Sequence, residues 1–461
     1  MRKEKDTMGS MYVPDDAYYG AQTQRAIENF PISNITISSS MIRALGIIKR
    51  SAAIVNNNLD LLNNERKIAI VQAADEMIEG KFDNQFPIDI YQTGSGTSSN
   101  MNCNEILSNR ASEIMGGKIG SKDPVHPNDH VNLGQSSNDV IPTAIHIAVN
   151  VALENELIPA MQKTVNELDN KVSKFSSIVK IGRTHLQDAT PITLGQEFSG
   201  YKQMMKNGIK RIQNTQSLLA ELAQGGTAVG TGINTSENFG SLMANEISHF
   251  TGIKFCESPN HFEAQGAQDA AVETSGALKT VAVSLSKIAN DIRWLGSGPR
   301  AGLGELILPA IQPGSSIMPG KTNPVICESM IQICAQVIGN DTAITIGGQG
   351  GILELNLMLP LIAHNLTNSI KILTNGCKVF TDKLLVGLKA NEEVCLGHIE
   401  GSLAMCTSLA PVIGYDKAAK IANKAYSSGK TIREIAMEET ILDKNELDKL
   451  LDPESMTKPS K

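Results

Sequence analysis

The chain has 461 residues and a formal net charge of -7, so it is long enough for a large core or for two to three domains. Its acidic balance, with a pI of about 5.7, offers no basic surface for nucleic acid or an anionic membrane. No apolar run approaches the ~18 residues of a membrane-spanning helix.

The first twenty residues, MRKEKDTMGSMYVPDDAYYG, are charged and contain no apolar stretch of the kind found in signal peptides. Glu4 and Asp6 are also unlike a mitochondrial transit peptide, which is poor in acidic residues. We therefore expect a cytoplasmic protein. The seven cysteines include no C-x-x-C pair, so we interpret them as small buried hydrophobic residues and predict no metal site.

Apolar residues in the middle of the chain repeat at alternating spacings of three and four. One series is Ile158, Met161, Val165, Leu168, Val172 and Phe175, and another is Leu278, Val281, Leu285, Ile288, Ile292 and Leu295. This heptad spacing is typical of long helices in a bundle. Further long helical segments are predicted around 189–224, 324–340 and 356–385. Since no run alternates cleanly between polar and apolar residues, we predict few strands and an all-α fold.

Two stretches predict domain boundaries. Residues 116–135 are rich in Gly, Pro, Asn and His, and near 387–392 the heptad pattern gives way to a shorter, more charged helical section. We predict an N-terminal domain over residues 1–136, a central helical bundle over 137–391 and a small helical C-terminal domain over 392–461.

Five stretches rich in glycine, hydroxyl and amide side chains interrupt the helical pattern. Helix capping explains each of them alone: Ser137-Asn138-Asp139 is typical of a helix start, and Gly225-Gly226 of a helix end. Together, their donors suit a small, oxygen-rich anionic ligand. The stretches are TGSGTSSNMNCNE (93–105), HPNDHVNLGQSSND (126–139), GRTHLQD (182–188), GGTAVGTGIN (225–234) and GSSIMPGKTNPVICES (314–329).

The last stretch is similar at first sight to a phosphate-binding loop, G-x-x-x-x-G-K-[ST]. The spacing does not fit, because the first glycine would fall at Ser315, and Pro324 disfavours the helix that should follow at once. Lys321 instead offers a fixed positive charge and Asn323 a hydrogen bond to a carboxylate. Ser315 can serve as a base only if Lys321 or convergent backbone N–H groups stabilise its deprotonated form.

His185 is the candidate acid or base of the third stretch. Glu328 can orient or polarise it if the two side chains meet. A histidine on a helix is also often purely structural, and the residues alone leave both interpretations open.

Motifs along the whole chain resemble the class II, metal-free fumarases of the fumarase/aspartase superfamily. The superfamily signature is similar to GSSIMPGKTNP. The other matching stretches are DTMGSMYVP, GAQTQRAIENF, QTGSGTSSNMNCNE, HPNDHVN, QSSNDVIPTAIHIA, GRTHLQDATPITLGQE, GGTAVGTGIN and IANDIRWLGSGPR. The resemblance implies a cofactor-independent lyase that reversibly hydrates fumarate to (S)-malate in the tricarboxylic acid cycle. His185, Gly320 and Ser137 match fumarases at positions where aspartases typically differ.

The resemblance also implies residue roles. Ser315 would take the C3 proton of malate, Lys321 and Asn323 would hold the resulting aci-carboxylate dianion, and His185, polarised by Glu328, would activate water. The side chains and backbone implied to bind the substrate are those of Ser95, Gly96, Thr97, Ser136, Ser137, Asn138, Thr184, Ser316, Lys321 and Asn323.

The resemblance further implies a three-domain fold and a homotetramer with a twenty-helix core, in which three subunits form each active site. The segment with His126, Asn128 and Asp129 resembles a second dicarboxylate-binding site of class II fumarases. That site usually has an arginine three residues before the histidine, where this chain has Asp123, and an acid there should repel a dicarboxylate. We also note His130, which replaces the commoner Asp.

Two alternatives compete with a fumarase. One is an aspartate ammonia-lyase or another fumarate-releasing lyase of the superfamily, which His185, Gly320 and Ser137 disfavour. The other is a helical scaffold without catalysis, which the intact set of catalytic motifs disfavours.

Overall fold

The computed structural model describes residues 1–439 and 442–459, and most of them are helical. The all-α prediction is therefore confirmed. The chain divides into two compact units, each built from three separate segments. Unit 1 comprises Met1–Pro159, Gly208–Ala282 and Ile333–Asn375, and unit 2 comprises Ala160–Asn207, Val283–Gln332 and Gly376–Lys461. Within the described ranges, no helix is long and apolar enough to cross a membrane.

The division into three domains at residues 136/137 and 391/392 stays a prediction. The last two residues of its C-terminal part, 460 and 461, lie outside the described residues.

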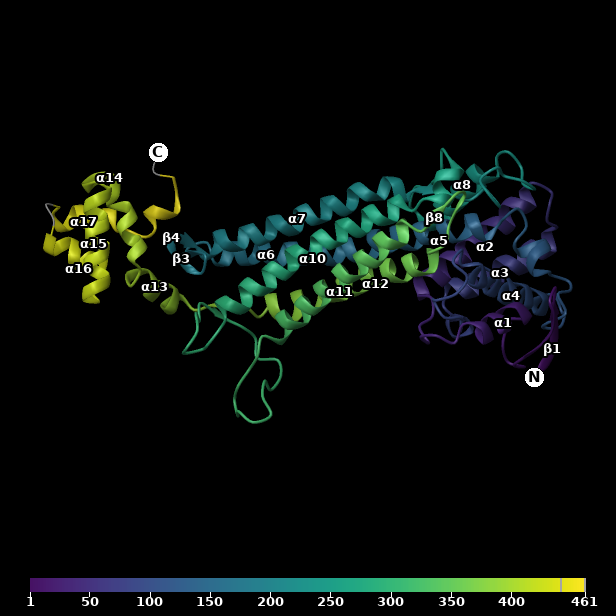
Figure 1. The fold of residues 1–461 in the computed structure, drawn as a ribbon, viewed down its shortest axis with the longest axis horizontal. Helices are drawn as coiled ribbons and strands as arrows, with labels where there is room; N and C mark the ends of the chain where they lie inside the picture. Colours follow the sequence, from purple (N-terminus) through teal and green to yellow (C-terminus); the bar gives the residue numbers. More distant parts are fainter. Residues whose placement is uncertain (440–441, 460–461) are drawn as a thin grey trace. The chain divides into compact units, whose positions relative to one another are not determined.

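Unit 1 contains a layer of helices beside an N-terminal hairpin (Figure 1). α2 packs against α3 and α5, and α4 packs against α3. The elements that lie wholly in this unit are β1 (Arg2–Asp6), β2 (Gly9–Val13), α1 (Ala21–Asn29), α2 (Ser39–Asn58), α3 (Asn64–Ile78), η1 (Asp83–Gln85), α4 (Thr97–Ile114), η2 (Pro127–Val131), α5 (Ser137–Ala152), η3 (Leu153–Leu157), β5 (Glu221–Leu222), α8 (Phe239–Thr251), β6 (Cys256–Glu257), α9 (His261–Gly266), β8 (Gly351–Ile352) and β9 (Leu355–Asn356).

Five long helices lie in the predicted helical segments: α6 (Ile158–Lys174), α7 (Leu194–Leu219), α10 (Asp269–Leu295), α11 (Val325–Gly348) and α12 (Leu359–Val379). All six predicted apolar positions of α10, from Leu278 to Leu295, are buried, because residues three and four apart share one helix face. In α6, Met161, Val165 and Leu168 are buried. The predicted segment 189–224 was too long, because its first residues form a strand.

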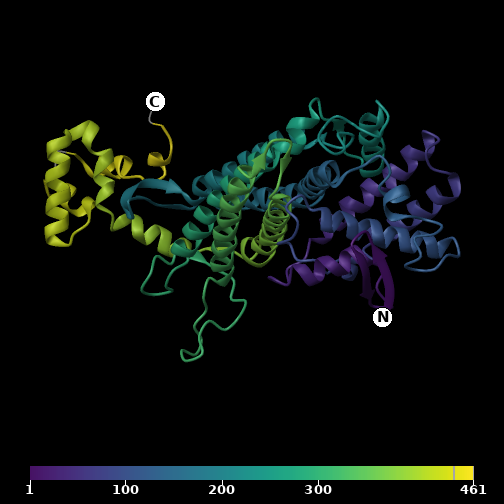
Figure 2. The same cartoon turned by 45° about the vertical axis from the view of Figure 1, so that its right-hand side comes forward.

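Unit 2 holds that strand, the segment around it and the last helices. Its own elements are β3 (Val179–Thr184), β4 (Gln187–Thr193), β7 (Leu306–Ile307), η4 (Phe380–Leu385), β10 (Lys389–Ala390), α13 (Glu392–Glu400), η5 (Leu403–Ser408), α14 (Ala410–Ile413), α15 (Tyr415–Ser428), α16 (Ile432–Glu439), α17 (Lys444–Leu450) and η6 (Ser455–Thr457). The last helices gather around buried Ile399, Leu409 and Ile435 (Figure 2).

Strands among the described residues are short and form only two-stranded sheets. The sheets β1–β2, β3–β4, β7–β10 and β8–β9 are antiparallel, whereas β5 and β6 are parallel. In β3–β4, Val179 pairs with Thr193 and Thr184 pairs with Gln187, with one irregularity between Ile181 and Arg183. The turn of this hairpin carries His185, one of the candidate site residues.

Glu105 of α4 provides the cap that α1 lacks locally. The residue before α1 is Gly20, which has no side chain to cap the helix. The carboxylate of Glu105 accepts hydrogen bonds from the backbone N–H groups of Gly20 (2.9 Å), Gln22 (2.9 Å) and Thr23 (3.1 Å). Burial raises the pKa of Glu105. A remote carboxylate therefore fixes α1 on α4.

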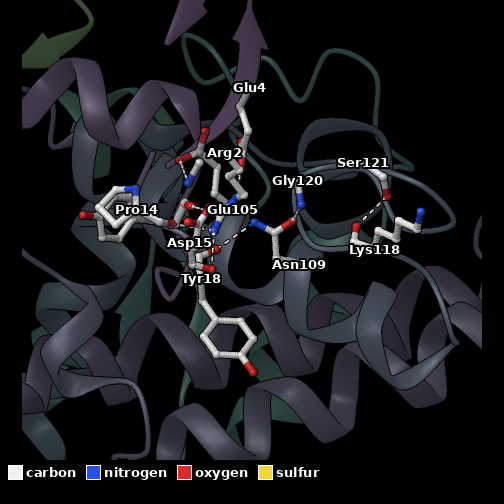
Figure 3. Close-up of polar contacts among 12 residues, drawn as sticks. Arg2, Glu4, Pro14, Asp15, Tyr18, Glu105, Asn109, Lys118, Gly120 and Ser121 are labelled. Atoms are coloured by element: carbon white, nitrogen blue, oxygen red, sulfur yellow. Dashed lines mark hydrogen bonds and ion pairs between the residues drawn. The ribbon is translucent and has the colours of Figure 1, made fainter. Parts of the chain in front are cut away.

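The N-terminal hairpin is attached near the same helix, as Figure 3 shows. The Arg2 guanidinium pairs with Glu4 at 2.6 Å and donates to the backbone oxygen of Pro14 at 2.8 Å. Asn109 of α4 donates to the Tyr18 carbonyl (2.8 Å) and accepts from the Gly120 N–H (2.7 Å). α4 is thus held from several sides, which matters because its first turn belongs to the candidate site.

Candidate active site

Three candidate residues of the first stretch lie at the start of α4: Thr97 opens the helix, and Ser95 and Gly96 come directly before it. The hydroxyls of Ser95 and Thr97 lie 2.7 Å apart. Gly96 has a φ of +70°, and an added Cβ would come within 2.9 Å of the Ile141 side chain on α5. Only glycine fits that conformation and that close approach without strain. The start of α4 therefore packs directly against α5.

The start of α5 presents the second group of predicted residues. Ser136 caps the helix: its Oγ accepts from the Asn138 N–H (3.2 Å), while its own N–H donates to Asp139 (2.9 Å). The predicted cap is thus right in kind but begins one residue earlier. Asn100 of α4 donates to Ser137 Oγ at 3.0 Å, so the two helix starts are joined.

The glycine-rich stretch 225–234 completes this group in unit 1. Helix capping predicts that Gly225 and Gly226 end a helix. They do not, because α7 already ends at Leu219. They lie in a loop whose N–H groups at Gly225 (3.2 Å) and Thr227 (2.9 Å) donate to the buried Asp139 carboxylate. Asn138 donates to the Ala228 carbonyl at 2.8 Å. Three of the five polar stretches thus meet.

These three stretches can bind an anion. A helix N-terminus offers free backbone N–H groups and a positive dipole end, and two of them lie together here. The hydroxyls of Ser95, Thr97 and Ser136 add further donors. The arrangement suits a carboxylate group.

His185 lies in the tight turn of the β3–β4 hairpin in unit 2. His185 and Leu186 have φ values of 55° and 59°, and the His185 and Thr184 side chains are exposed. The structural interpretation, a histidine packed on a helix, is therefore wrong. Among the described residues its imidazole has no hydrogen-bond partner, so it is free to meet a ligand.

A buried charge network lies behind this hairpin. Glu305 is fully buried and pairs with Lys180 of β3 (3.1 Å), Arg183 of β3 (2.7 Å) and His398 of α13 (3.0 Å). Lys180 also pairs with Glu197 of α7 at 3.1 Å. Burial alone would raise the pKa of Glu305, but its cationic partners outweigh burial and hold that pKa below its usual range. The network fixes the strand that leads to His185.

We predict that Glu305→Gln loosens the hairpin. Removing one partner of a buried ion pair leaves the others uncompensated, at a cost of about 3–5 kcal/mol in the free energy of unfolding. We expect kcat to fall at least about tenfold, because a misplaced group far from the reacting atoms can slow turnover strongly. Urea unfolding at fixed protein concentration and steady-state kinetics measure both effects. Glu393→Gln, an exposed glutamate on α13, is the control, and equal stability of the two variants would contradict the prediction.

The stretch 308–324 is a long loop that ends where α11 begins (Figure 2). Its neck is closed by a backbone hydrogen bond from Gly314 to Lys321 (2.8 Å) and by Asn323, which donates to the Gly314 carbonyl at 2.7 Å. Gly320 has a φ of +79°, which glycine adopts freely. Lys321 is exposed. The loop is thus a closed polar turn that presents its lysine to solvent.

Ser315 accepts two hydrogen bonds within this loop. Its Oγ receives the backbone N–H groups of Ile317 (3.2 Å) and Met318 (2.9 Å). These are convergent donors of the kind that stabilise a deprotonated hydroxyl. Ser316, beside it, is exposed.

Glu328 lies in the first turn of α11, where its backbone N–H donates to the Pro324 carbonyl at 3.1 Å. In a single chain, no hydrogen bond or ion pair between described residues joins its side chain to His185. The predicted pairing of Glu328 with His185 therefore stays a prediction.

The predicted second site lies in and beside the short helix η2. His126 caps that helix, and its Nδ1 accepts from the N–H groups of Asn128 (3.3 Å) and Asp129 (3.2 Å). The Asp129 carboxylate also lies 3.3 Å from that nitrogen. His130 accepts from the His126 N–H at 2.8 Å, and burial lowers its pKa. Asp123 is exposed. His126, Asn128 and Asp129 thus come together at η2, and an exposed acidic residue precedes them in the chain.

Sequence reasoning missed buried charges that support candidate site residues, among them Lys49 on α2 in unit 1 and Glu305 in unit 2. Both stand inside apolar runs, LGIIKRSAAIV and GLGELILP. A charge in such a run is the signal that could have found them, because charged side chains are almost never fully buried unless paired.

Comparison with known proteins identifies the family. A family model described as "Lyase" matches residues 9–339, and one described as "Fumarase C C-terminus" matches residues 405–458. A class II fumarate hydratase of Halobacterium salinarum is 54% identical over 456 residues, 99% of this chain and 97% of that protein. A mitochondrial fumarate hydratase of Rhizopus oryzae is 52% identical over 459 residues, 99% of this chain and 92% of that protein.

A solved structure agrees with these matches. The recombinant class II fumarase from Schistosoma mansoni superposes with a TM-score of 0.97 at 40% identity and covers 100% of both chains. The fold and the matches define a lyase of the fumarase/aspartase type. More closely, the chain belongs to the class II fumarate hydratase family. The resemblance of its motifs to that family is thereby confirmed.

Proposed function

We propose that this protein catalyses the reversible hydration of fumarate to (S)-malate, by anti addition through an aci-carboxylate intermediate, in the tricarboxylic acid cycle. The observation that supports it best is the geometry at Ser315. The two backbone N–H groups on its Oγ meet the condition that a serine base requires. The protein's membership of the class II fumarate hydratase family supports fumarate over other substrates.

The dehydration direction gives the proposed role of each group. Ser315, as alkoxide, takes the C3 proton of malate, and the electron pair left on C3 spreads into the neighbouring carboxylate. Lys321 and Asn323 stabilise the resulting dianion. The C2–O bond then breaks, the hydroxyl leaves as water with a proton supplied through His185, and the electron pair returns to form the C2=C3 double bond. Hydration reverses these steps.

Substrate binding falls to the helix starts of unit 1 and to groups of unit 2. The proposed ligands are Ser95, Gly96, Thr97, Ser136, Ser137, Asn138, Thr184, Ser316, Lys321 and Asn323. No cofactor takes part in these steps.

We further propose a homotetramer with a twenty-helix core, whose active sites each draw on three subunits. Glu328 and His185, which form no contact within one chain, would then meet across a subunit interface. The exposed apolar residues on the long helices, including Val283 and Ile346, offer surface for such association. Sedimentation analysis of the purified protein tests the assembly. The cytoplasmic location stays a prediction that fractionation tests.

Turnover of malate tests the proposed activity. We expect fumarate to appear from malate, followed by its ultraviolet absorbance, and the rate to be insensitive to chelators and oxygen. Activity with aspartate and none with malate would identify an ammonia-lyase instead. Absence of turnover with both substrates would indicate a non-catalytic protein.

At the second site we predict that Asp123→Arg increases dicarboxylate affinity. The change replaces an exposed carboxylate three residues before His126 with a cation, so the Kd for malate at that site should fall at least about tenfold. Occupancy in malate-soaked crystals and a calorimetric titration measure it. Unchanged occupancy would remove the second site from consideration, and Lys122→Arg is the control for a neighbouring change that keeps its charge.

A further inference from the structure

Lys49 is a fully buried lysine that forms no ion pair with a carboxylate among the described residues. Three lysine side chains are almost completely buried among the described residues: Lys49, Lys171 and Lys180. Lys171 lies 3.5 Å from Glu167, and Lys180 lies 3.1 Å from both Glu197 and Glu305. In the described parts of the chain, Lys49 has no such ion pair within 4.0 Å. A buried ammonium group without a counter-ion is unfavourable unless something compensates it.

The partners of Lys49 are neutral amides. Its Nζ donates to Asn132 Oδ1 at 2.8 Å and to Gln135 Oε1 at 3.0 Å. Both residues belong to the polar stretch that leads into α5. The stretch is thus held by the lysine, while neither of these hydrogen-bond partners carries a negative charge.

A chain of hydrogen bonds leads from Lys49 to the candidate carboxylate site. The oxygen of Asn132 that accepts from Lys49 also accepts from Asn100 (3.3 Å) and Asn104 (3.1 Å), both on α4. Asn100 donates in addition to Ser137 Oγ at 3.0 Å. Lys49 therefore lies behind the two helix starts that present the proposed substrate ligands, and it fixes them to one another.

Two titratable groups on neighbouring elements face Lys49. Burial raises the pKa of the Cys103 thiol on α4 to about 12, so that group is neutral. Asp139 on α5 is buried, and its pKa is raised to about 7; its oxygens accept from Ser136, Gln224, Gly225 and Thr227 rather than from Lys49. Burial lowers the pKa of Lys49 to about 8. Neither neighbour forms an ion pair with the lysine within 4.0 Å, although the charges of Asp139 and Lys49 act on each other over a longer distance.

We propose that Lys49 is a positioning residue whose buried positive charge is balanced by the substrate carboxylate bound at the starts of α4 and α5. This inference rests on the proposed function, because it assumes a dicarboxylate at that site. Lys49 acts through Asn132, Asn100 and Ser137 and does not touch the substrate. The positive charge of Lys49 would favour binding of a dianionic ligand at the helix starts without any contribution from the loop that carries Ser315.

The test compares Lys49→Met with Lys171→Met, using succinate as a non-reacting dicarboxylate and the full-length protein. If one unit charge acts over about 10 Å at an effective dielectric constant of about 20, its loss changes a binding constant about tenfold. We expect Lys49→Met to raise the succinate Kd and the KM for malate about tenfold, with a smaller change in kcat. Lys171→Met, which removes an equally buried lysine, should leave all three values unchanged. Wild-type affinity in Lys49→Met would overturn the proposal.

The pH dependence separates charge from packing. An anion bound near Lys49 raises the pKa of its ammonium group, so binding takes up a proton between about pH 8 and 9, and affinity falls as pH rises through that range. Calorimetry of succinate binding in two buffers of different ionisation enthalpy measures this uptake in the wild type, even if Lys49→Met does not fold. No uptake in the wild type, or uptake that persists in a folded Lys49→Met protein, overturns the proposal. Wild-type turnover of malate reports separately on the proposed function.

Discussion

Ser315→Ala is expected to lower kcat for malate dehydration by about 10²–10⁴-fold, the range by which a positioned general base contributes. Alanine offers no acceptor for the C3 proton, and the N–H groups of Ile317 and Met318 lose the oxygen that they now stabilise. The neck of the loop is closed by other groups, the backbone of Gly314 and Lys321 and the Asn323 amide. The variant should therefore fold and bind succinate within a few-fold of the wild type.

Two measurements separate a lost base from a disturbed loop. Exchange of the malate C3 hydrogen with deuterated water should be lost together with turnover, since both need the same proton transfer. Thr322→Ala, an exposed change in the same loop, should keep wild-type rates. Near wild-type turnover by Ser315→Ala would show that another group removes the proton.

The long helices are the part of the fold that sequence reasoning predicts well. Burial of Leu278, Leu285 and Ile292 on one face of α10 is the direct physical cause of the spacing that predicted that helix. The β3–β4 hairpin was not predicted, because its turn lacks the glycine or asparagine that usually adopts positive φ. His185 and Leu186 occupy that conformation instead, at a cost of order 1–3 kcal/mol each. Such strain is characteristic of functional turns.

Sequence reasoning likewise predicts one part of the candidate site and misses another. The polar residues at the starts of α4 and α5 could be predicted, because the groups that bind a carboxylate stand together in short motifs. Their supports could not: Lys49 contacts Asn132, and Glu305 contacts Lys180, across long stretches of sequence. No local pattern reports contacts of that kind. Only the fold shows that these two charges hold the residues that the motifs name.

His185→Asn is expected to lower kcat by about 10²–10⁴-fold and to leave the fold intact. Asparagine is one of the few side chains that adopts a positive φ readily, so it suits the turn position, where φ is 55°. It keeps hydrogen-bonding groups but cannot transfer a proton to or from water at neutral pH. His249→Asn, the same change at an exposed histidine on α8, should keep wild-type kinetics. If His185→Asn also keeps wild-type kinetics, water is activated by another group.

Mixing the two inactive proteins tests where the groups of one site come from. In the proposed tetramer, His185 and Ser315 of one active site belong to different subunits. Unfolding Ser315→Ala and His185→Asn chains together and refolding them should then form some sites in which both residues are intact. Malate turnover should reappear in the mixture and stay absent when each protein is refolded alone. If the mixture stays inactive although mixed tetramers form, both residues of a site come from one chain. Glu328 would then have to reach His185 by a movement within that chain, because the two side chains make no contact in the structure described.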